Sequence, residues 1–298
     1  PLVLGSATPD INTYYNAKNG EIELLELTKR ANNSNLPNVE VVDLKLELAN
    51  GNRSMLSFDL YQAIEQNLKD KLQTILFLNR RGYSSFVTCK NCGYTVKCPH
   101  CDITLTYHKS SNNLRCHYCG YATNITNVCP ECHEKSLTTL GVGTEKIEEE
   151  LHTLIPAAKI LRMDFDTTSK KGSHAKMIEE FKEHKYDILL GTQIVAKGLD
   201  FENVTLVGVV NADTSLNIPN FRSSEQTFSL LSQVAGRSGR SSKTGEVIIQ
   251  TYNPTHYAIE CVKHHDYLDF FNKEMNIRRR LNYPPYYYVT YIRVSGKD

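Results

Sequence analysis

The sequence predicts an α/β fold, a parallel sheet with helices on both faces, interrupted by an inserted module that binds two zinc ions. Short apolar runs alternate with amphipathic segments, which is typical of a parallel sheet covered by helices. Eight of the nine cysteines fall in four Cys-x-x-Cys pairs within one short stretch. With 298 residues and 40% hydrophobic residues, we expect one large or two ordinary domains.

The first fifty residues predict the end of one domain and a linker. Pro1–Thr8 has the pattern of a buried strand followed by a turn, and residues from about 10 to 18 that of a short helix. Asparagines and a proline break the apolar runs between 22 and 48, which is typical of a linker. Because the chain opens on proline, we expect it to be a fragment of a longer protein.

A second domain is expected over residues 51–262. Ser57 is placed to cap a helix whose apolar residues Leu60, Ile64, Leu68 and Leu72 share one face. The apolar run Thr74–Leu78 then predicts a short strand that ends at a turn containing Arg80 and Arg81.

The alternation of strands and helices resumes after the cysteine-rich insertion, which we place at 89–135. The predicted strands are Leu137–Val142, Lys159–Met163, Asp187–Leu190, Val204–Val210 and Val247–Thr251. The predicted helices are Glu145–Leu154, Ala175–Glu183 with Met177, Ile178 and Phe181 inward, and about Glu225–Val234. Ser223 and Gln226 are placed for a capping box on the last helix, and residues 263–298 predict the start of another domain.

The cysteine pairs predict two closed zinc sites. Thiolates are soft ligands, and four of them complete a tetrahedral Zn²⁺ site with no position left for water, so the ions are expected to be structural. The residue after the second cysteine of each pair often needs a positive φ, which suits Gly93 and Gly120 and is tolerated by Asp102 and His133. Three histidines lie in or beside the turns and are alternative ligands: His100, His117 and His133.

Four pairs can combine into two sites in three ways. We favour a nested arrangement because it leaves a 14-residue hairpin, 102–115, between its inner pairs, whereas sequential pairing leaves only residues 93–97 between pairs. One site then holds Cys89, Cys92, Cys129 and Cys132, and the other holds Cys98, Cys101, Cys116 and Cys119. The ninth cysteine, Cys261, is expected to be a small core residue.

Composition and charge exclude several classes of protein. No apolar run approaches the length of a membrane helix and no signal peptide opens the chain, so we expect a cytoplasmic protein without membrane contacts. The formal net charge of +1 means that nucleic-acid binding has to come from a local basic track. A zinc deaminase is a poor alternative, since its His-x-Glu signature is missing.

Two segments predict contacts with phosphates. Gln233–Arg240 places Arg237 and Arg240 three residues apart at a helix end, where two guanidinium groups can converge on one anion. The loop from Gly191 to Phe201 follows a strand end, a position where ligands commonly bind in such sheets.

The loop supplies several candidate ligand residues. Thr192 and Gln193 are expected to contact nucleic-acid phosphates, and Asp200 to hold a ribose hydroxyl. Arg80 and Arg81 are weaker candidates for DNA contacts. No Gly-x-x-x-x-Gly-Lys-Ser/Thr motif occurs and no Asp-Glu metal-binding pair follows a strand, so half of an ATP site is missing from the sequence.

Three segments resemble the later motifs of superfamily 2 helicases: Gly5–Thr8, residues 188–213 and Gln233–Arg240. With the four cysteine pairs set after Phe77–Tyr83, the chain is most similar to the bacterial replication-restart DNA helicases of that superfamily. The resemblance implies a RecA-like second lobe over 51–262, following the end of lobe 1 and its linker (1–50). The chain is then a C-terminal-half fragment that begins, but does not finish, a further domain.

The resemblance also implies the function. It is that of an ATP-dependent 3′-to-5′ DNA helicase with Mg²⁺ as cofactor, acting on stalled forks, D-loops and single strands. Arg237 and Arg240 correspond to arginine fingers, Gln233 to the same nucleotide motif, and Gly198 and Asp200 to a segment that links nucleotide state to DNA. Ser6, Ala7 and Thr8 correspond to a coupling motif. Primosome and helicase-loading proteins and a single-stranded DNA-binding protein are the implied partners, and the nucleoid is the implied location.

The helicase hypothesis makes one prediction about the fragment itself, and zinc removal separates the hypothesis from its alternative. The fragment alone is expected to hydrolyse no ATP, because one lobe is missing. The alternative is a non-catalytic zinc-ribbon scaffold that binds DNA or primosome proteins; it would lose its binding function entirely when zinc is stripped, whereas a motor lobe would keep its α/β core.

Overall fold

The fold is described from a computed structural model of the chain. The described residues are 2–27, 36–79, 86–108, 111–139, 144–164, 167, 173–192, 201–236, 245–290 and 292. Within this part of the chain, no helix combines the length and the apolar character needed to cross a membrane.

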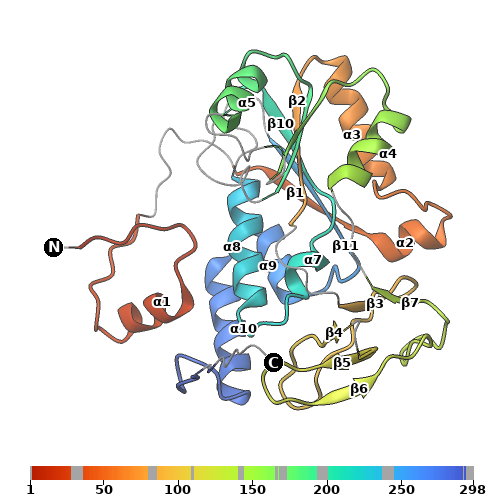
Figure 1. The fold of residues 1–298 in the computed structure, drawn as a ribbon. Helices are drawn as coiled ribbons and strands as arrows, with labels where there is room; N and C mark the ends of the chain where they lie inside the picture. Colours follow the sequence, from red (N-terminus) through yellow and green to blue (C-terminus); the bar gives the residue numbers. More distant parts are fainter. Residues whose placement is uncertain are drawn as a thin grey trace.

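A parallel six-stranded sheet forms the centre of the larger region (Figure 1). Its strand order is β1-β11-β10-β2-β9-β8, and each neighbouring pair is parallel. The strands are β1 (Asn38–Asp43), β2 (Gln73–Phe77), β8 (Ile160–Met163), β9 (Ile188–Gly191), β10 (Val204–Val209) and β11 (Glu246–Thr251). The strands β2, β9 and β10 are buried along their whole length, as expected for the centre of a sheet covered on both faces.

Alternate residues of the strands enter two separate apolar clusters. Along β2, Ile75 and Phe77 belong to one cluster, and Leu76 and the following Leu78 belong to the other. Helices α3 and α4 cover the second cluster, and α5, α8, α9 and α10 cover the first (Figure 1). Helices thus lie on both faces of a parallel sheet, which is the predicted fold class.

The described helices agree in position with most of the predicted ones. They are α1 (Ile11–Lys18), α2 (Leu44–Ala49), α3 (Phe58–Lys69), α4 (Thr144–Leu154), α5 (Ser173–Lys182), α7 (Asp213–Leu216), α8 (Ser223–Ala235), α9 (Tyr257–Lys263) and α10 (Tyr267–Arg280). In α5, Phe181 is buried and Met177 and Ile178 pack against the core, so the predicted inward face is confirmed.

The two predicted helix caps have different outcomes. The Ser57 side chain accepts a hydrogen bond from the Leu60 backbone N–H at 3.2 Å, so this cap is confirmed. The capping box of Ser223 and Gln226 is wrong, because α8 begins at Ser223 itself and its N-cap residue, Arg222, makes no side-chain cap. The Arg222 side chain is instead paired with two acids, and the helix start is fixed by that ion pair.

The sheet begins earlier than the expected domain start at residue 51. Strand β1 follows the asparagine-rich break and pairs with β11 over six residues, so a segment read as linker is an edge strand. Its apolar residues Val39 and Val42 enter the clusters on opposite faces, which gives the segment its place in the sheet.

The two ends of the chain also differ from expectation. Residues 2–8 form no strand, and Leu2 and Val3 are 85% and 84% exposed, so the predicted buried strand is wrong for this structure. A strand needs a paired neighbour, and none is present beside residues 2–8 within the described chain. Helix α10, expected to open a separate domain, buries Phe270 and Phe271 in the first apolar cluster and so packs on the lobe.

The cysteine-rich insertion forms a separate small module. Its neck is an antiparallel pair of strands, β3 (Val87–Cys89) with β7 (Leu137–Thr139). The strand predicted at Leu137–Val142 therefore begins in the neck and not in the parallel sheet. Beyond the neck lies a three-stranded sheet of β4 (Thr106–His108), β5 (Asn113–Arg115) and β6 (Ala122–Asn124), in which β4 and β5 form the predicted hairpin.

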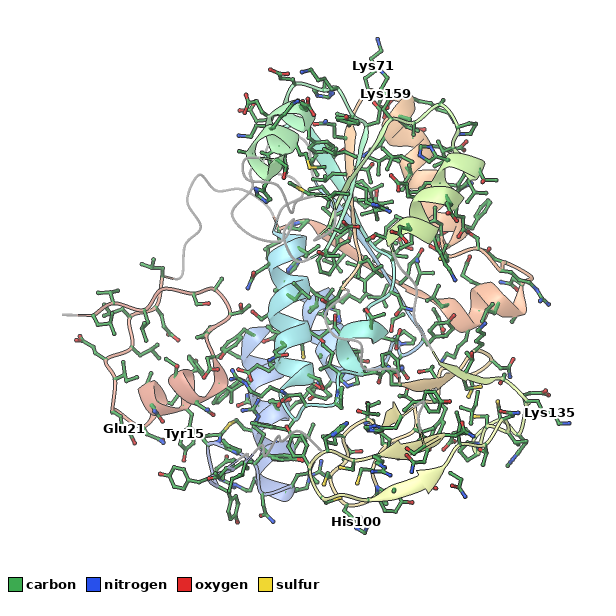
Figure 2. The ribbon with its side chains drawn as sticks, in the orientation of Figure 1. Tyr15, Glu21, Lys71, His100, Lys135 and Lys159 are labelled. Atoms are coloured by element: carbon green, nitrogen blue, oxygen red, sulfur yellow. The ribbon has the colours of Figure 1, made fainter. Side chains whose placement is uncertain are left out.

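The module lies at the end of the parallel sheet where the strands finish. Lys71 and Lys159 precede β2 and β8, and both lie at the opposite end of the molecule from His100 and Lys135 of the module (Figure 2). The insertion therefore extends from the carboxyl edge of the sheet, the edge where ligands commonly bind.

Candidate metal centres and motor segments

Four backbone turns of the same kind present the eight cysteines. In each, the residue after the second cysteine donates its N–H to the carbonyl of the first at 2.9–3.0 Å. That residue has a positive φ in every turn, which is 75° at Gly93, 52° at Asp102, 76° at Gly120 and 61° at His133. The predicted backbone requirement is thus present in all four turns, and each turn points two sulfur atoms to the same side.

The turns bring the sulfur atoms together in two groups. Cys89, Cys92, Cys129 and Cys132 form one group, and Cys98, Cys101, Cys116 and Cys119 form the other. Within each group all four sulfurs lie within 4.8 Å of one another. This grouping corresponds to the nested arrangement, in which the outer site closes the neck and the inner site holds the hairpin.

The donor sets fit zinc. Four sulfurs at about 2.3 Å from a tetrahedral ion lie roughly 3.8 Å apart. The Cys92–Cys129 and Cys98–Cys119 sulfurs are 3.5 Å apart. Neither group includes a histidine among the described residues, so each has four thiols and no open position. The two cysteine groups are consistent with two zinc ions.

The thiols of one group differ in acidity before a metal binds. Burial raises the pKa of Cys92 to about 12. Hydrogen bonding from the Tyr121 backbone lowers the pKa of Cys119 to about 7, and hydrogen bonding from the Glu134 backbone lowers that of Cys132 to about 6. Each group therefore contains a thiol that ionises near neutral pH, whereas metal binding at Cys92 must displace a proton.

The ninth cysteine has no part in either group. Cys261 is 1% exposed in the core of the lobe, where its thiol lies 3.3 Å from a carboxylate oxygen of Asp269. It is a buried core residue, as its isolation in the sequence predicts.

The module is seated on the lobe by both backbone and side-chain contacts. A Cβ at Gly93 would lie 2.5 Å from the Tyr252 Cβ, so the first cysteine turn packs directly on the residue that follows β11. On the other side, the Tyr283 hydroxyl donates to the Cys101 carbonyl at 3.1 Å. A cavity of about 290 Å³ remains between module and lobe, with His256 and Lys97 among its lining residues.

The described motor residues come from two places on the lobe. Thr192 directly follows β9 at the carboxyl edge of the sheet. Gln233 is exposed near the end of α8, and its amide donates to the Ser229 hydroxyl at 3.1 Å. No hydrogen bond joins Thr192 to Gln233 in the described part of the chain. The other candidates lie outside the described residues: Arg80, Arg81, Gln193, Gly198, Asp200, Arg237 and Arg240.

Ser229 lies between two predicted motor segments that are far apart in the sequence, the one that contains Thr8 and the one that contains Gln233. Its hydroxyl lies 3.0 Å from the Thr8 hydroxyl and also accepts from Gln233, so Thr8 and Gln233 share one intermediary. Nothing in the sequence marks Ser229, because a serine within an amphipathic helix is ordinary.

A buried ionic cluster lies beside α8, and no local sequence pattern indicates it. Arg278 is 1% exposed and pairs with Glu225 and Glu274, at 2.8 Å each. Glu225 also accepts from the Ile11 backbone N–H and pairs with Arg222. The Arg278–Arg280 run resembles a solvated basic helix end in sequence, so only the tertiary structure shows that its first member is buried.

The parallel sheet with its inserted cysteine module fits a RecA-like helicase lobe that carries a zinc-ribbon module, and two family matches support this class. Residues 130–242 match the family described as helicase conserved C-terminal domain. Residues 98–123 match the family described as PriA DNA helicase Cys-rich region domain.

Curated relatives match along the whole chain. It is 53% identical over 298 residues to the replication restart protein PriA of Bacillus subtilis, and 44% identical over 306 residues to that of Synechocystis. Both matches cover 100% of this chain and 37% of the relative. Among solved structures, RecG bound to a three-way DNA junction matches with a TM-score of 0.43 and 12% identity, over 92% of this chain and 29% of that chain.

The similarity confirms the resemblance that the motifs predicted. The chain is similar to a part of the PriA replication restart proteins and spans about two fifths of the length of the curated relatives it matches.

Proposed function

We propose that this chain supplies the second motor lobe and the zinc module of an ATP-dependent 3′-to-5′ DNA helicase that restarts replication at stalled forks. The observation that carries the proposal is the combination of a helicase-type parallel sheet with two four-cysteine groups, in a chain similar to PriA along its whole length. Either feature alone is compatible with many functions.

The nucleotide-facing residues are proposed to lie at and beyond the end of α8. Arg237 and Arg240 act as arginine fingers, placing permanent positive charge against the phosphates of ATP·Mg²⁺ bound between two lobes. Gln233, Gly198 and Asp200 complete this side of the site. The direction of α8 supports the proposal, because the helix is anchored at its start by Glu225 and ends at Ala235, two residues before Arg237 in the sequence.

A DNA track is proposed along the carboxyl edge of the sheet. Strands β2 and β9 are neighbours, and the Leu78 N–H donates to the Gly191 carbonyl at 3.0 Å. In the sequence, the segment that continues from β2 carries Arg80 and Arg81, and the segment that continues from β9 carries Thr192 and Gln193. Their common starting point supports one continuous phosphate-binding surface on single-stranded DNA.

The two zinc ions are proposed to be structural. Each group supplies four thiolates, so a bound ion has no site for a substrate. The module would present a surface to forks and D-loops and to the proteins of primosome assembly, helicase loading and single-strand binding. With this function, the protein is proposed to act in the bacterial cytoplasm, at the nucleoid.

An unwinding assay on the intact protein tests the proposal. Forked duplexes with a 3′ or a 5′ single-stranded tail are incubated with protein and ATP, with zinc-loaded and zinc-stripped samples compared. The expected result is unwinding from the 3′ tail only, with fork unwinding lost after zinc removal while single-strand binding persists. A zinc-loaded, folded protein that binds forks but unwinds neither substrate would support the zinc-ribbon scaffold instead.

A further inference from the structure

The two cysteine groups contact the lobe in different ways. The Cys98–Cys119 group is joined to it by hydrogen bonds from both of its turns. The Tyr283 hydroxyl donates to the Cys101 carbonyl at 3.1 Å, and the Tyr118 hydroxyl accepts from the Phe221 backbone N–H at 3.4 Å. The other group rests on Tyr252 through Gly93, with no side-chain hydrogen bond to the lobe among the described residues.

The residues that meet the Cys98–Cys119 group form an aromatic stack. The rings of Tyr283 and Phe221 lie 4.8 Å apart with an angle of 14° between their planes. The Arg278 guanidinium lies 5.3 Å from the centre of the Phe221 ring. The Tyr283 backbone N–H donates to the Arg278 carbonyl at 2.8 Å, so the tyrosine is fixed to the end of α10.

Arg278 carries the contact into the lobe. Its guanidinium pairs with Glu225 on α8 and Glu274 on α10 and donates to the Pro284 carbonyl at 3.2 Å. Charges buried in this way are stable only while their partners hold position, because a lost partner leaves an uncompensated charge. The end of α10 and the first turn of α8 are therefore fixed to each other.

An unbroken series of contacts thus runs from one metal group to the helix that leads to Gln233. It begins at Cys101 and Tyr118, passes through the Tyr283–Phe221 stack to Arg278, and ends at Glu225. We propose that Tyr283 is a positioning residue through which an ion in the Cys98–Cys119 group stabilises the first half of α8. This inference rests on the zinc binding proposed above.

The proposal distinguishes the two metal groups. An ion in the Cys98–Cys119 group orders Cys101 and Tyr118, the residues that contact the stack. An ion in the other group orders the neck, which is seated on Tyr252 and makes no hydrogen bond to α8 among the described residues. Loss of the first ion is therefore expected to loosen α8, and loss of the second is not.

Hydrogen exchange on the intact protein tests the proposal, with zinc counted by native mass spectrometry. Two matched variants each remove one ligand, Cys119→Ala from one group and Cys132→Ala from the other. We expect each to lose one zinc ion, and only Cys119→Ala to raise amide exchange in residues 223–231, by at least about threefold, the effect of one lost hydrogen bond. Equal exchange in the two variants would overturn the proposal.

A second variant tests Tyr283 without touching a ligand. Tyr283→Phe keeps the ring stack and removes only the hydrogen bond to Cys101, and Tyr288→Phe, at a fully exposed tyrosine, is its control. We expect Tyr283→Phe to retain both ions, to raise exchange in α8, and to reduce the further response to Cys119→Ala to the part carried by the Tyr118–Phe221 hydrogen bond. Additive effects of the two substitutions would show that Tyr283 acts independently of the metal and would contradict the proposal.

The zinc count separates this inference from the proposed function. A wild-type protein that holds no zinc contradicts the zinc proposal itself. If the wild type holds two ions and Cys119→Ala leaves amide exchange in α8 unchanged, only the role of Tyr283 is contradicted.

Discussion

The parallel-sheet lobe and the zinc module are held together by different forces. The lobe buries two extended apolar clusters, one on each face of its sheet. The module has a cluster of only six buried residues in the described chain, and two of these are cysteines of a metal group. The secondary structure also differs: the module has short strands and, within its described residues, no helix (Figure 1).

The comparison shows where metal replaces burial. A segment of this size cannot remove enough apolar surface from water to offset its lost conformational entropy. In the proposed zinc-bound form, zinc–thiolate bonds supply the missing stability, so the module needs no extension of the core of the lobe. The lobe is expected to fold without metal, and the module is not.

Zinc removal is the largest expected perturbation and the one that can break this comparison. Structural zinc sites contribute about 10–16 kcal/mol of apparent binding energy in isolated zinc-finger peptides. We expect a chelator to abolish exchange protection in the module and to leave the sheet strands protected, as measured by hydrogen exchange. Loss of protection in β2 and β10 on the same timescale would show that the lobe depends on the metal.

The affinity of the cysteine groups for zinc is expected to depend on pH with a defined sign. Thiols must lose protons to bind zinc, so protons compete with the metal and affinity falls as pH falls. Because burial raises the pKa of Cys92 to about 12, proton release on zinc binding should be measurable at neutral pH by titration in two buffers of different ionisation enthalpy. Equal heats in the two buffers would contradict thiolate binding.

Two glycines separate the stability of the module from its seating on the lobe. Gly93 and Gly120 have φ values of 75° and 76°, so alanine costs roughly 1–2 kcal/mol of backbone strain at either. Only at Gly93 would the new Cβ meet Tyr252; at Gly120 nothing lies within 4 Å. We expect Gly93→Ala to lower the melting temperature more than Gly120→Ala and to raise exchange around Tyr252. Equal effects would show that the module is not seated as described.

His256 gives a smaller effect at the boundary between the two regions. Its ring nitrogen Nδ1 accepts from the Ala258 N–H, and burial, followed by the charge of Lys97 in the module, lowers the pKa of His256 to about 4. The unfolded chain, with an ordinary histidine pKa near 6.5, binds this proton more readily. Stability is therefore fully present above about pH 6.5 and is lost as pH falls toward 4, by about 1–2 kcal/mol at pH 5.

Denaturant unfolding at pH 7 and pH 5 measures this pH-dependent loss of stability. His256→Asn is the matched variant, because asparagine also caps helices and does not titrate. It should lose less stability than the wild type between the two pH values, while any loss of zinc at pH 5 affects both proteins. An identical loss of stability in the two proteins would show that His256 does not cause the pH dependence.

The smallest effect concerns two serines at helix starts in the lobe. Ser57 caps α3 through a bond to the Leu60 N–H, so Ser57→Ala is expected to cost about 1 kcal/mol. Ser223 begins α8 without a cap, and Ser223→Ala should change stability by only a few tenths of a kcal/mol. Thermal unfolding of both variants checks the difference, and a larger effect at Ser223 would contradict the described start of α8.

The module was the easier region to predict from the sequence. Its ligands, the positive φ after each second cysteine and the hairpin between the inner pairs all depend on local spacing and coordination chemistry. The favoured nested pairing rested on the same local argument, since residues 93–97 are too few to form a module between sequential pairs.

The limits of the lobe were harder to predict because they depend on distant partners. Strand β1 looks like a linker after an asparagine-rich break, and only its pairing with β11 places it in the sheet. Arg278 looks like part of a solvated basic run, and Glu225 on another helix is what buries it. A single sequence contains no local signal for either contact.

ATP turnover by the intact protein, with and without single-stranded DNA, tests the central claim most directly. Wild type is compared with Arg240→Ala and with Arg53→Ala, which removes an exposed arginine elsewhere on the lobe. The account predicts DNA-stimulated turnover in wild type and Arg53→Ala, and a loss of roughly 10³-fold or more in Arg240→Ala. A folded, zinc-loaded protein that hydrolyses no ATP, or an Arg240→Ala variant with full turnover, would contradict it.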